Sequence, residues 1–152
     1  MVEVVVLSPA DAEAGIEGLA DLLLDCIAGG ASVGFLYGVT HEDARAFWRD
    51  TIAGIGKGAT VLFAARDGAR LVGTVLLHPI GKANQPHRAE VAKLLVLRSA
   101  RRGGIASRLM DALEAHALGI GRTLLTLDTE TGSGAEPFYR RRGYVRVGDI
   151  PG

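Results

Sequence analysis

The sequence of 152 residues has a single cysteine, Cys26, and no long apolar run. One cysteine excludes an internal disulfide and a cysteine-rich metal site, and its neighbours LLLDCIA favour a buried thiol over a reactive one. No apolar stretch approaches the roughly 18 residues that a membrane span needs. The N-terminal segment carries Glu3 and no basic region, so it does not resemble a signal peptide. We therefore expect a cytoplasmic protein with no membrane partner.

The sequence also lacks an excess of charge of either sign. Lys and Arg number 17, Asp and Glu number 17, and the net charge is zero, which gives no general attraction to nucleic acid. The histidines show no metal-ligand spacing, so we expect no metal. The length suits one domain, residues 1–152, with a sizeable core. A local basic cluster is present nonetheless, formed by Arg98, Arg101, Arg102 and Arg108.

Segments whose apolar residues recur with the period of a strand alternate along the sequence with segments whose apolar residues recur with the period of a helix. Glycine and proline lie between them. Strands are predicted at 2–7, 59–66, 69–80, 87–97, 122–129 and 143–148. Helices are predicted from Ser8-Pro9 to Gly29-Gly30, from Thr40 to Ile52, from Gly104 to Leu118, and over 135–142. Asp67-Gly68 favours a hairpin between the second and third strands. This order predicts an α/β fold with a mixed sheet and helices on both faces.

The stretch RRGGIA (101–106) joins a predicted strand to a predicted helix. The first amides of a helix are unpaired, and glycines ahead of them let the backbone approach an anion, so this arrangement can bind phosphate. Neither Gly-Lys pair is followed by Ser or Thr, and GxGxxG is absent, which excludes the Walker and Rossmann patterns. The pattern present is Arg-x-x-Gly-x-Ala, formed by Arg101, Gly104 and Ala106.

This spacing resembles the acetyl-CoA signature of the GNAT acetyltransferases, and AEPFYRRRGY (135–144) resembles the second motif of that family. A predicted helix and strand separate the two motifs, as in the family, and the resemblance extends from about residue 59 to the end. RAEVAKLLV (88–96), LDTETGS (127–133) and VGDIPG (147–152) look like the tabtoxin-resistance type of bacterial acetyltransferase. The implied fold is the GNAT fold, in the order β-α-α-β-β-β-α-β-α-β, with the fourth and fifth strands splayed apart.

The resemblance implies acetyl-CoA as co-substrate and assigns residues to it. The pantetheine arm is expected on the backbone of Leu94, Leu95 and Val96. The pyrophosphate is expected at the loop and helix start formed by Arg101, Arg102, Gly103, Gly104, Ile105, Ala106 and Ser107. The family often has Asn where this sequence has Gly132, which puts that side-chain bond to pantetheine in doubt and leaves the backbone or Ser133 as replacements.

Tyr139 aligns with the general acid of the family, which gives a proton to the departing thiolate. A base is also needed, because only the free amine attacks a thioester. Glu90 and Asp128 are the candidates, and His87 is a weaker one. Each has a structural alternative: Tyr139 as a core tyrosine, Glu90 as a solvated strand residue and Asp128 as the cap of a turn. No covalent nucleophile is required, so we expect direct transfer.

The resulting hypothesis is an N-acetyltransferase that moves an acetyl group from acetyl-CoA to a primary amine of a small molecule, either amino-acid-like or similar to an antibiotic or toxin. Two alternatives stay open. The acceptor could be a protein N-terminus or a lysine, or the chain could be a CoA-binding sensor without catalysis. A homodimer is plausible from the habit of the family.

Overall fold

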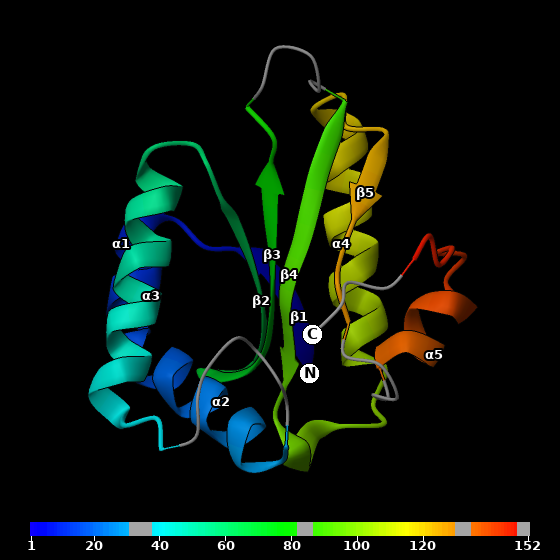
Figure 1. Ribbon diagram of the computed structural model, residues 1–152. Helices are drawn as coiled ribbons and strands as arrows, with labels where there is room; N and C mark the ends of the chain where they lie inside the picture. The colour runs from blue at the N-terminus through cyan, green and yellow to red at the C-terminus, as the bar shows by residue number, and fades with distance from the viewer. Residues whose placement is uncertain (31–37, 82–86, 130–134, 149–152) are drawn as a thin grey trace.

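The computed structural model describes residues 1–30, 38–81, 87–129 and 135–148, and it contains one five-stranded sheet in the order β1-β2-β3-β4-β5 (Figure 1). The strands are β1 (Val2–Val6), β2 (Val61–Asp67), β3 (Arg70–Pro79), β4 (Arg88–Val96) and β5 (Leu124–Thr126). The helices are α1 (Pro9–Ala14), α2 (Ile16–Ala28), α3 (His41–Gly56), η1 (Arg98–Ala100), α4 (Ile105–Gly119) and α5 (Ala135–Arg141). Neighbouring strands are antiparallel except for β4 and β5, which are parallel.

Helices cover both faces of this sheet, as the order of elements predicted (Figure 1). On one face, α1, α2 and α3 enclose a core that contains the fully buried Trp48 and includes Leu62 and Leu76 of the strands. On the other face, α4 packs its buried residues against Phe63 and Leu77. Successive side chains of a strand point to opposite faces, so neighbouring residues of β2 and β3 supply the two separate cores.

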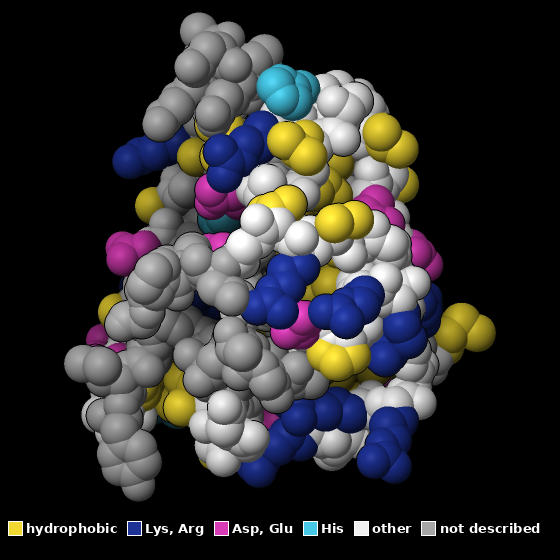
Figure 2. Space-filling model, turned by 45° about the vertical axis from the view of Figure 1, so that its right-hand side comes forward, with side chains coloured by type: hydrophobic (Ala, Val, Ile, Leu, Met, Phe, Trp, Pro, Cys, Tyr) yellow, Lys and Arg dark blue, Asp and Glu magenta, His cyan; other side chains and the backbone are white. Residues whose placement is uncertain are grey.

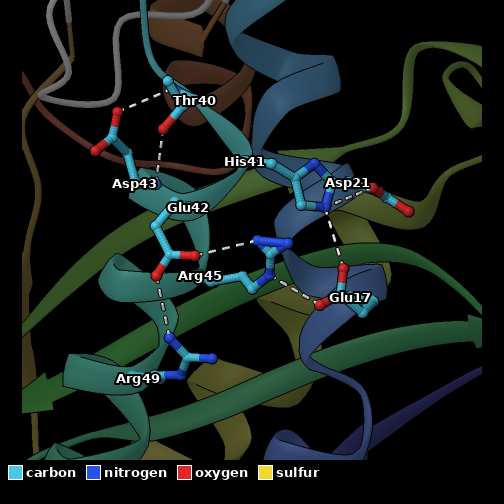
Figure 3. Close-up of polar contacts among 8 residues, drawn as sticks. All are labelled: Glu17, Asp21, Thr40, His41, Glu42, Asp43, Arg45 and Arg49. Atoms are coloured by element: carbon cyan, nitrogen blue, oxygen red, sulfur yellow. Dashed lines mark hydrogen bonds and ion pairs between the residues drawn. The ribbon is translucent and has the colours of Figure 1, made fainter.

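The start of α3 follows the predicted signal, a capping box between Thr40 and Asp43 (Figure 3). Thr40 Oγ1 accepts a hydrogen bond from the Asp43 amide at 3.1 Å, and Asp43 Oδ2 accepts one from the Thr40 amide at 2.9 Å. Figure 3 also shows His41 and Arg45 of α3 reaching Glu17 of α2, at 3.1 and 2.9 Å. Exposed pairs of this kind contribute at most about 1 kcal/mol each, so they mainly fix how α3 lies on α2.

The structure differs from the predicted elements in three places. The strand predicted at 122–129 is confined to β5, Leu124–Thr126. The helix predicted from Pro9 to Ala28 is divided at Gly15, because glycine is a weak helix former and its amide ends α1 on the carbonyls of Asp11 and Ala12. The strand predicted at 143–148 is wrong, since residues 144–148 form no strand with any part of the chain that the structure describes. Alternating valines indicate β propensity, but a strand also needs a partner.

Candidate active site

The parallel pair β4–β5 forms a fork in the sheet. The two strands pair only where Arg88, Ala89 and Glu90 lie opposite Leu124, Leu125 and Thr126. Beyond Glu90, the edge of β4 from Val91 to Val96 pairs with no strand on that side among the described residues. The stretch predicted to hold pantetheine, residues 94–96, lies on this edge, where backbone groups have no strand partner. The Val96 carbonyl is the exception, because it accepts hydrogen bonds from Arg101 Nε and Cys26 Sγ.

A β-bulge lies at the fork, in β4. Thr74 of β3 is opposite Leu95 and Leu76 is opposite Ala92, so two residues, Lys93 and Leu94, face one residue of β3. Lys93 has a φ of +53°, which is uncommon for a residue with a side chain. The bulge therefore interrupts the regular alternation of β4 next to its free edge.

The stretch RRGGIA (101–106) follows η1 and enters the first turn of α4. Gly104 caps the helix with a φ of +77°, and Arg102 also has a positive φ, of +68°. The first helical hydrogen bond runs from the Arg108 amide to the Gly104 carbonyl, at 3.1 Å. The amides of residues 102–107 donate to no atom within the described ranges. A run of unpaired amides at a helix start is suited to an anionic group.

The arginines of this region have different partners. Arg98 is bound to Asp25 of α2, through its amide at 2.9 Å and its Nε at 3.2 Å, and the hydrogen bond from that amide lowers the pKa of Asp25. Arg101 Nε donates to the Val96 carbonyl at 3.3 Å. Figure 2 shows Lys and Arg side chains gathered over the lower half of the molecule. The exposed arginines at the start of α4 and on α5 are Arg101, Arg102, Arg108, Arg140 and Arg141.

Tyr139 lies in α5 and is 7% exposed, packed in the core on the α4 face. Its ring contacts Tyr144 edge to face, with centroids 5.4 Å apart. Burial raises the pKa of Tyr139 to about 12, against a smaller opposing effect of Arg142. The phenol is therefore protonated throughout the neutral range and can act as a proton or hydrogen-bond donor.

A polar network supports Tyr139, and the sequence motif did not reveal it. Arg142 Nη2 bonds Asp111 at 2.8 Å and Glu114 at 2.9 Å, and its Nη1 donates to the Ser107 carbonyl at 3.4 Å. The Tyr144 hydroxyl donates to Glu114 at 2.9 Å. Arg142 thus connects α5 to the first turn of α4. The only sequence signal was a pair of carboxylates at i and i+3 on α4, facing a run of arginines.

The two predicted base candidates both lie at the fork. Glu90 is the last residue of β4 that pairs with β5, and its carboxylate is 3.5 Å from Arg88 Nη2. Asp128 is exposed and follows β5 by two residues. Leu125 and Leu127 pack on the α4 face. Thr126 lies between them in the chain and therefore faces the other side of the sheet, where its Oγ1 accepts a hydrogen bond from Arg88 Nε at 3.4 Å. The third candidate, His87, has an exposed side chain, and its carbonyl accepts the Thr123 amide at 2.8 Å.

Two residues near Glu90 were missed as site candidates. His78 of β3 lies directly opposite Glu90, and its Nδ1 is 3.0 Å from Thr60 Oγ1. Burial lowers the pKa of His78, so its imidazole is neutral at neutral pH. Lys93 places its Nζ 5.5 Å from the centre of the Phe47 ring of α3. Only the cross-strand register and the bulge bring these residues to the fork, and neither can be read from the sequence.

The remaining predictions have simple outcomes. Cys26 is buried, as predicted, its Sγ donates to the Val96 carbonyl at 3.5 Å, and burial raises its pKa. Gly132 and Ser133 lie outside the described residues. Within the described ranges, no cluster of three or more His, Cys, Asp or Glu side chains could hold a metal, and no helix has the length and apolarity to cross a membrane.

Comparison with known proteins places this geometry in a family. The model of the acetyltransferase (GNAT) family matches residues 23–144. The fold is similar to that of ribosomal-protein-alanine N-acetyltransferase from Brucella melitensis biovar Abortus 2308, with 19% identity, a TM-score of 0.67, and 100% of this chain and 96% of that chain covered. PaiA N-acetyltransferase from Thermoplasma acidophilum, in complex with coenzyme A, gives 18% identity and a TM-score of 0.74, covering 100% and 94%. An aminoglycoside acetyltransferase from an uncultured soil metagenomic sample, in complex with sisomicin, gives 14% and 0.70, covering 99% and 94%. The predicted fold class is thereby confirmed.

Proposed function

The chain belongs to the acetyltransferase (GNAT) family, and from this we propose that it transfers an acetyl group from acetyl-CoA directly to a primary amine of a small molecule. The observation that carries the proposal is the combination of the open fork at β4 with the unpaired amides of residues 102–107. A ligand with an extended arm and a pyrophosphate fits both features, because the arm needs free strand edges and the phosphates need unpaired donors.

The residues suited to hold acetyl-CoA are those predicted from the sequence. The backbone of Leu94, Leu95 and Val96 would bind the pantetheine arm, and the amides from Arg102 to Ser107 would bind the pyrophosphate. When bound, acetyl-CoA supplies the reactive thioester. Arg102, exposed at the loop, adds positive charge. Arg101 also adds positive charge, and its Nε donates a hydrogen bond to the Val96 carbonyl.

Tyr139 would stabilise the sulfur as it leaves. With its pKa raised to about 12, the phenol is a weak acid toward a thiolate whose pKa is near 8.5, so complete proton transfer is uphill. A hydrogen bond from the phenol to the developing thiolate carries no such penalty and gains strength as charge builds up. Tyr139 is therefore proposed as the donor that assists departure of the thiolate.

Glu90 is the first candidate for the base, because it lies where β4 and β5 part, and Asp128 is the second. Either carboxylate could accept a proton from the incoming ammonium, directly or through a water. The neutral imidazole of His78, across from Glu90 in the register, can serve as the next hydrogen-bond partner in the same region.

The relatives offer different acceptors. One is named for the alanine of a ribosomal protein and another was solved with the aminoglycoside sisomicin. The small-molecule proposal and the protein N-terminus alternative therefore both have structural relatives. The resemblance of residues 88–96 and 127–133 to the tabtoxin-resistance type favours a small acceptor. A sensor without catalysis would need neither the phenol nor the carboxylates at the fork.

A thiol-release assay with acetyl-CoA tests the proposal across amines, amino acids, aminoglycosides and peptides. Turnover on small amines, with peptides inactive, is the expected result. Turnover on peptides alone would favour the protein acceptor, and tight CoA binding without turnover on any amine would favour the sensor.

A further inference from the structure

Glu90 and Lys93 share one face of the sheet, on either side of the point where β4 loses its partner. Ala89 and Val91 pack in the core on the α4 face, so Glu90, which lies between them, points to the face covered by α1, α2 and α3. Lys93 points to the same face, because its ammonium lies over the Phe47 ring of α3. A carboxylate and an ammonium therefore border the same region of the fork.

The bulge gives Lys93 this position. In a regular strand, residues that are three apart face opposite sides. The extra residue at 93, with its φ of +53°, restores Lys93 to the side of Glu90. A lysine held in a strained conformation beside the predicted pantetheine edge is a costly arrangement for a residue with only a structural role.

The charge of Lys93 is not neutralised within the described part of the chain. Its side chain is half-buried, with no carboxylate within 4.0 Å in the described ranges, and its ammonium lies over the aromatic face of Phe47. Burial lowers the pKa of Lys93, which shows that the surroundings disfavour the bare ammonium. A ligand anion would supply the missing counter-charge.

We propose that Lys93 determines acceptor specificity by binding a carboxylate on the acceptor while Glu90 faces the acceptor amine, so that the substrate class is amino-acid-like. This inference rests on the proposed acetyl transfer. The same cation would repel polycationic acceptors such as aminoglycosides, since like charges close together in a partly buried site are unfavourable. An acceptor with neighbouring positive and negative groups matches the two side chains.

The test compares acetyl transfer to amino acids with transfer to their carboxamides, which have the same side chains but no carboxylate. Lys93→Met is the main variant, because methionine keeps much of the apolar stem over Phe47. Like lysine, it is an unbranched residue that must adopt the positive φ of this position. Lys57→Met is the matched control, an exposed lysine at the C-terminal cap of α3. Each acceptor is scored by the ratio of variant to wild-type kcat/KM, which cancels differences in amine basicity between acid and amide.

The expected result is a fall of about 10- to 100-fold for the amino acids in Lys93→Met, mainly through KM, with the carboxamides within about twofold of wild type. Lys57→Met should leave both classes unchanged. Equal losses for acids and amides, or a wild-type preference for sisomicin, would overturn the inference and leave acetyl transfer standing. No turnover on any amine would instead refute the proposed function, and the specificity inference with it.

Discussion

Gly104→Val is expected to weaken acetyl-CoA binding. The structure allows this effect to be distinguished from a general loss of protein stability. Gly104 has a φ of +77°, and a Cβ built there meets no atom within 4 Å. A clash between that Cβ and the described part of the protein is therefore excluded as the cause of an effect. What remains is the backbone: a β-branched residue in the left-handed region is strained, by about 2 kcal/mol or more.

The variant can respond in two ways. If the backbone keeps its φ, the free energy of unfolding falls by roughly 2 kcal/mol and the amides keep their direction. If the φ relaxes to a negative value, the loop amides before residue 104 turn relative to the helix amides after it, so the two sets no longer converge on the proposed pyrophosphate position. One lost hydrogen bond to a charged group costs about 1.5–3 kcal/mol, or roughly 10- to 150-fold in Kd. We expect the second response, because residues 101–104 of the loop are exposed.

The chain supplies a matched control at the opposite end of the same helix. Gly121 has a φ of +79°, and a Cβ there also meets no atom within 4 Å. Calorimetric titration with CoA should give a raised Kd for Gly104→Val and a wild-type value for Gly121→Val, with urea unfolding recording the stability of both. A wild-type Kd for Gly104→Val, or the same rise in both variants, would refute the phosphate-binding role of the loop.

Four further results are expected. Tyr139→Phe should lower kcat about 100-fold with the Kd of CoA unchanged, and an unaltered kcat in the thiol-release assay would remove Tyr139 from the mechanism. Glu90→Gln and Asp128→Asn should each lower kcat/KM, with a loss that shrinks at high pH where the amine is already free; a loss constant with pH would indicate positioning. Burial raises the pKa of Tyr139 from 10.0 to about 12, so the contribution of this pKa shift to stability is complete below pH 10.0 and is lost as pH rises through 12. The free energy of unfolding of Tyr139→Phe, measured in urea, should therefore change less with pH between 10.0 and 12 than that of the wild type. Arg142→Met should reduce the free energy of unfolding by about 1–3 kcal/mol, whereas the exposed Arg141→Met should leave it unchanged.

The sequence predicted those features that depend on neighbouring residues. The capping box at Thr40 and Asp43 needs only residues three apart, and the hairpin around Asp67-Gly68 needs only a turn of the right type. The loop at RRGGIA is also local, because Gly104 provides the positive φ at the helix cap without strain. Each of these structures is determined within one short segment, so its pattern of letters is sufficient.

The features that the sequence did not predict depend on register or on distant partners. The bulge at Lys93 arises from how β3 and β4 align. A one-residue difference in register between two strands cannot be recognised in the sequence of either strand. The position of His78 opposite Glu90 follows from the same alignment. Arg142, which follows α5, donates a hydrogen bond to Glu114 of α4. The valines of 143–148 have the pattern of a strand but no partner strand among the described residues. Such features require the three-dimensional arrangement.

The sheet separates the two halves of the proposed reaction. Tyr139 belongs to the core on the α4 face, whereas Glu90 points to the face of α1, α2 and α3, where Lys93 lies over Phe47. In direct transfer, the amine attacks the carbonyl carbon from one side while the thiolate leaves from another. The base must therefore reach the amine nitrogen, and the acid the sulfur, from different sides of one carbonyl. A complete sheet would block this approach. Beyond Glu90, β4 pairs with no strand on that side among the described residues, and we propose the fork as the place where a single carbonyl meets both groups without a covalent enzyme intermediate.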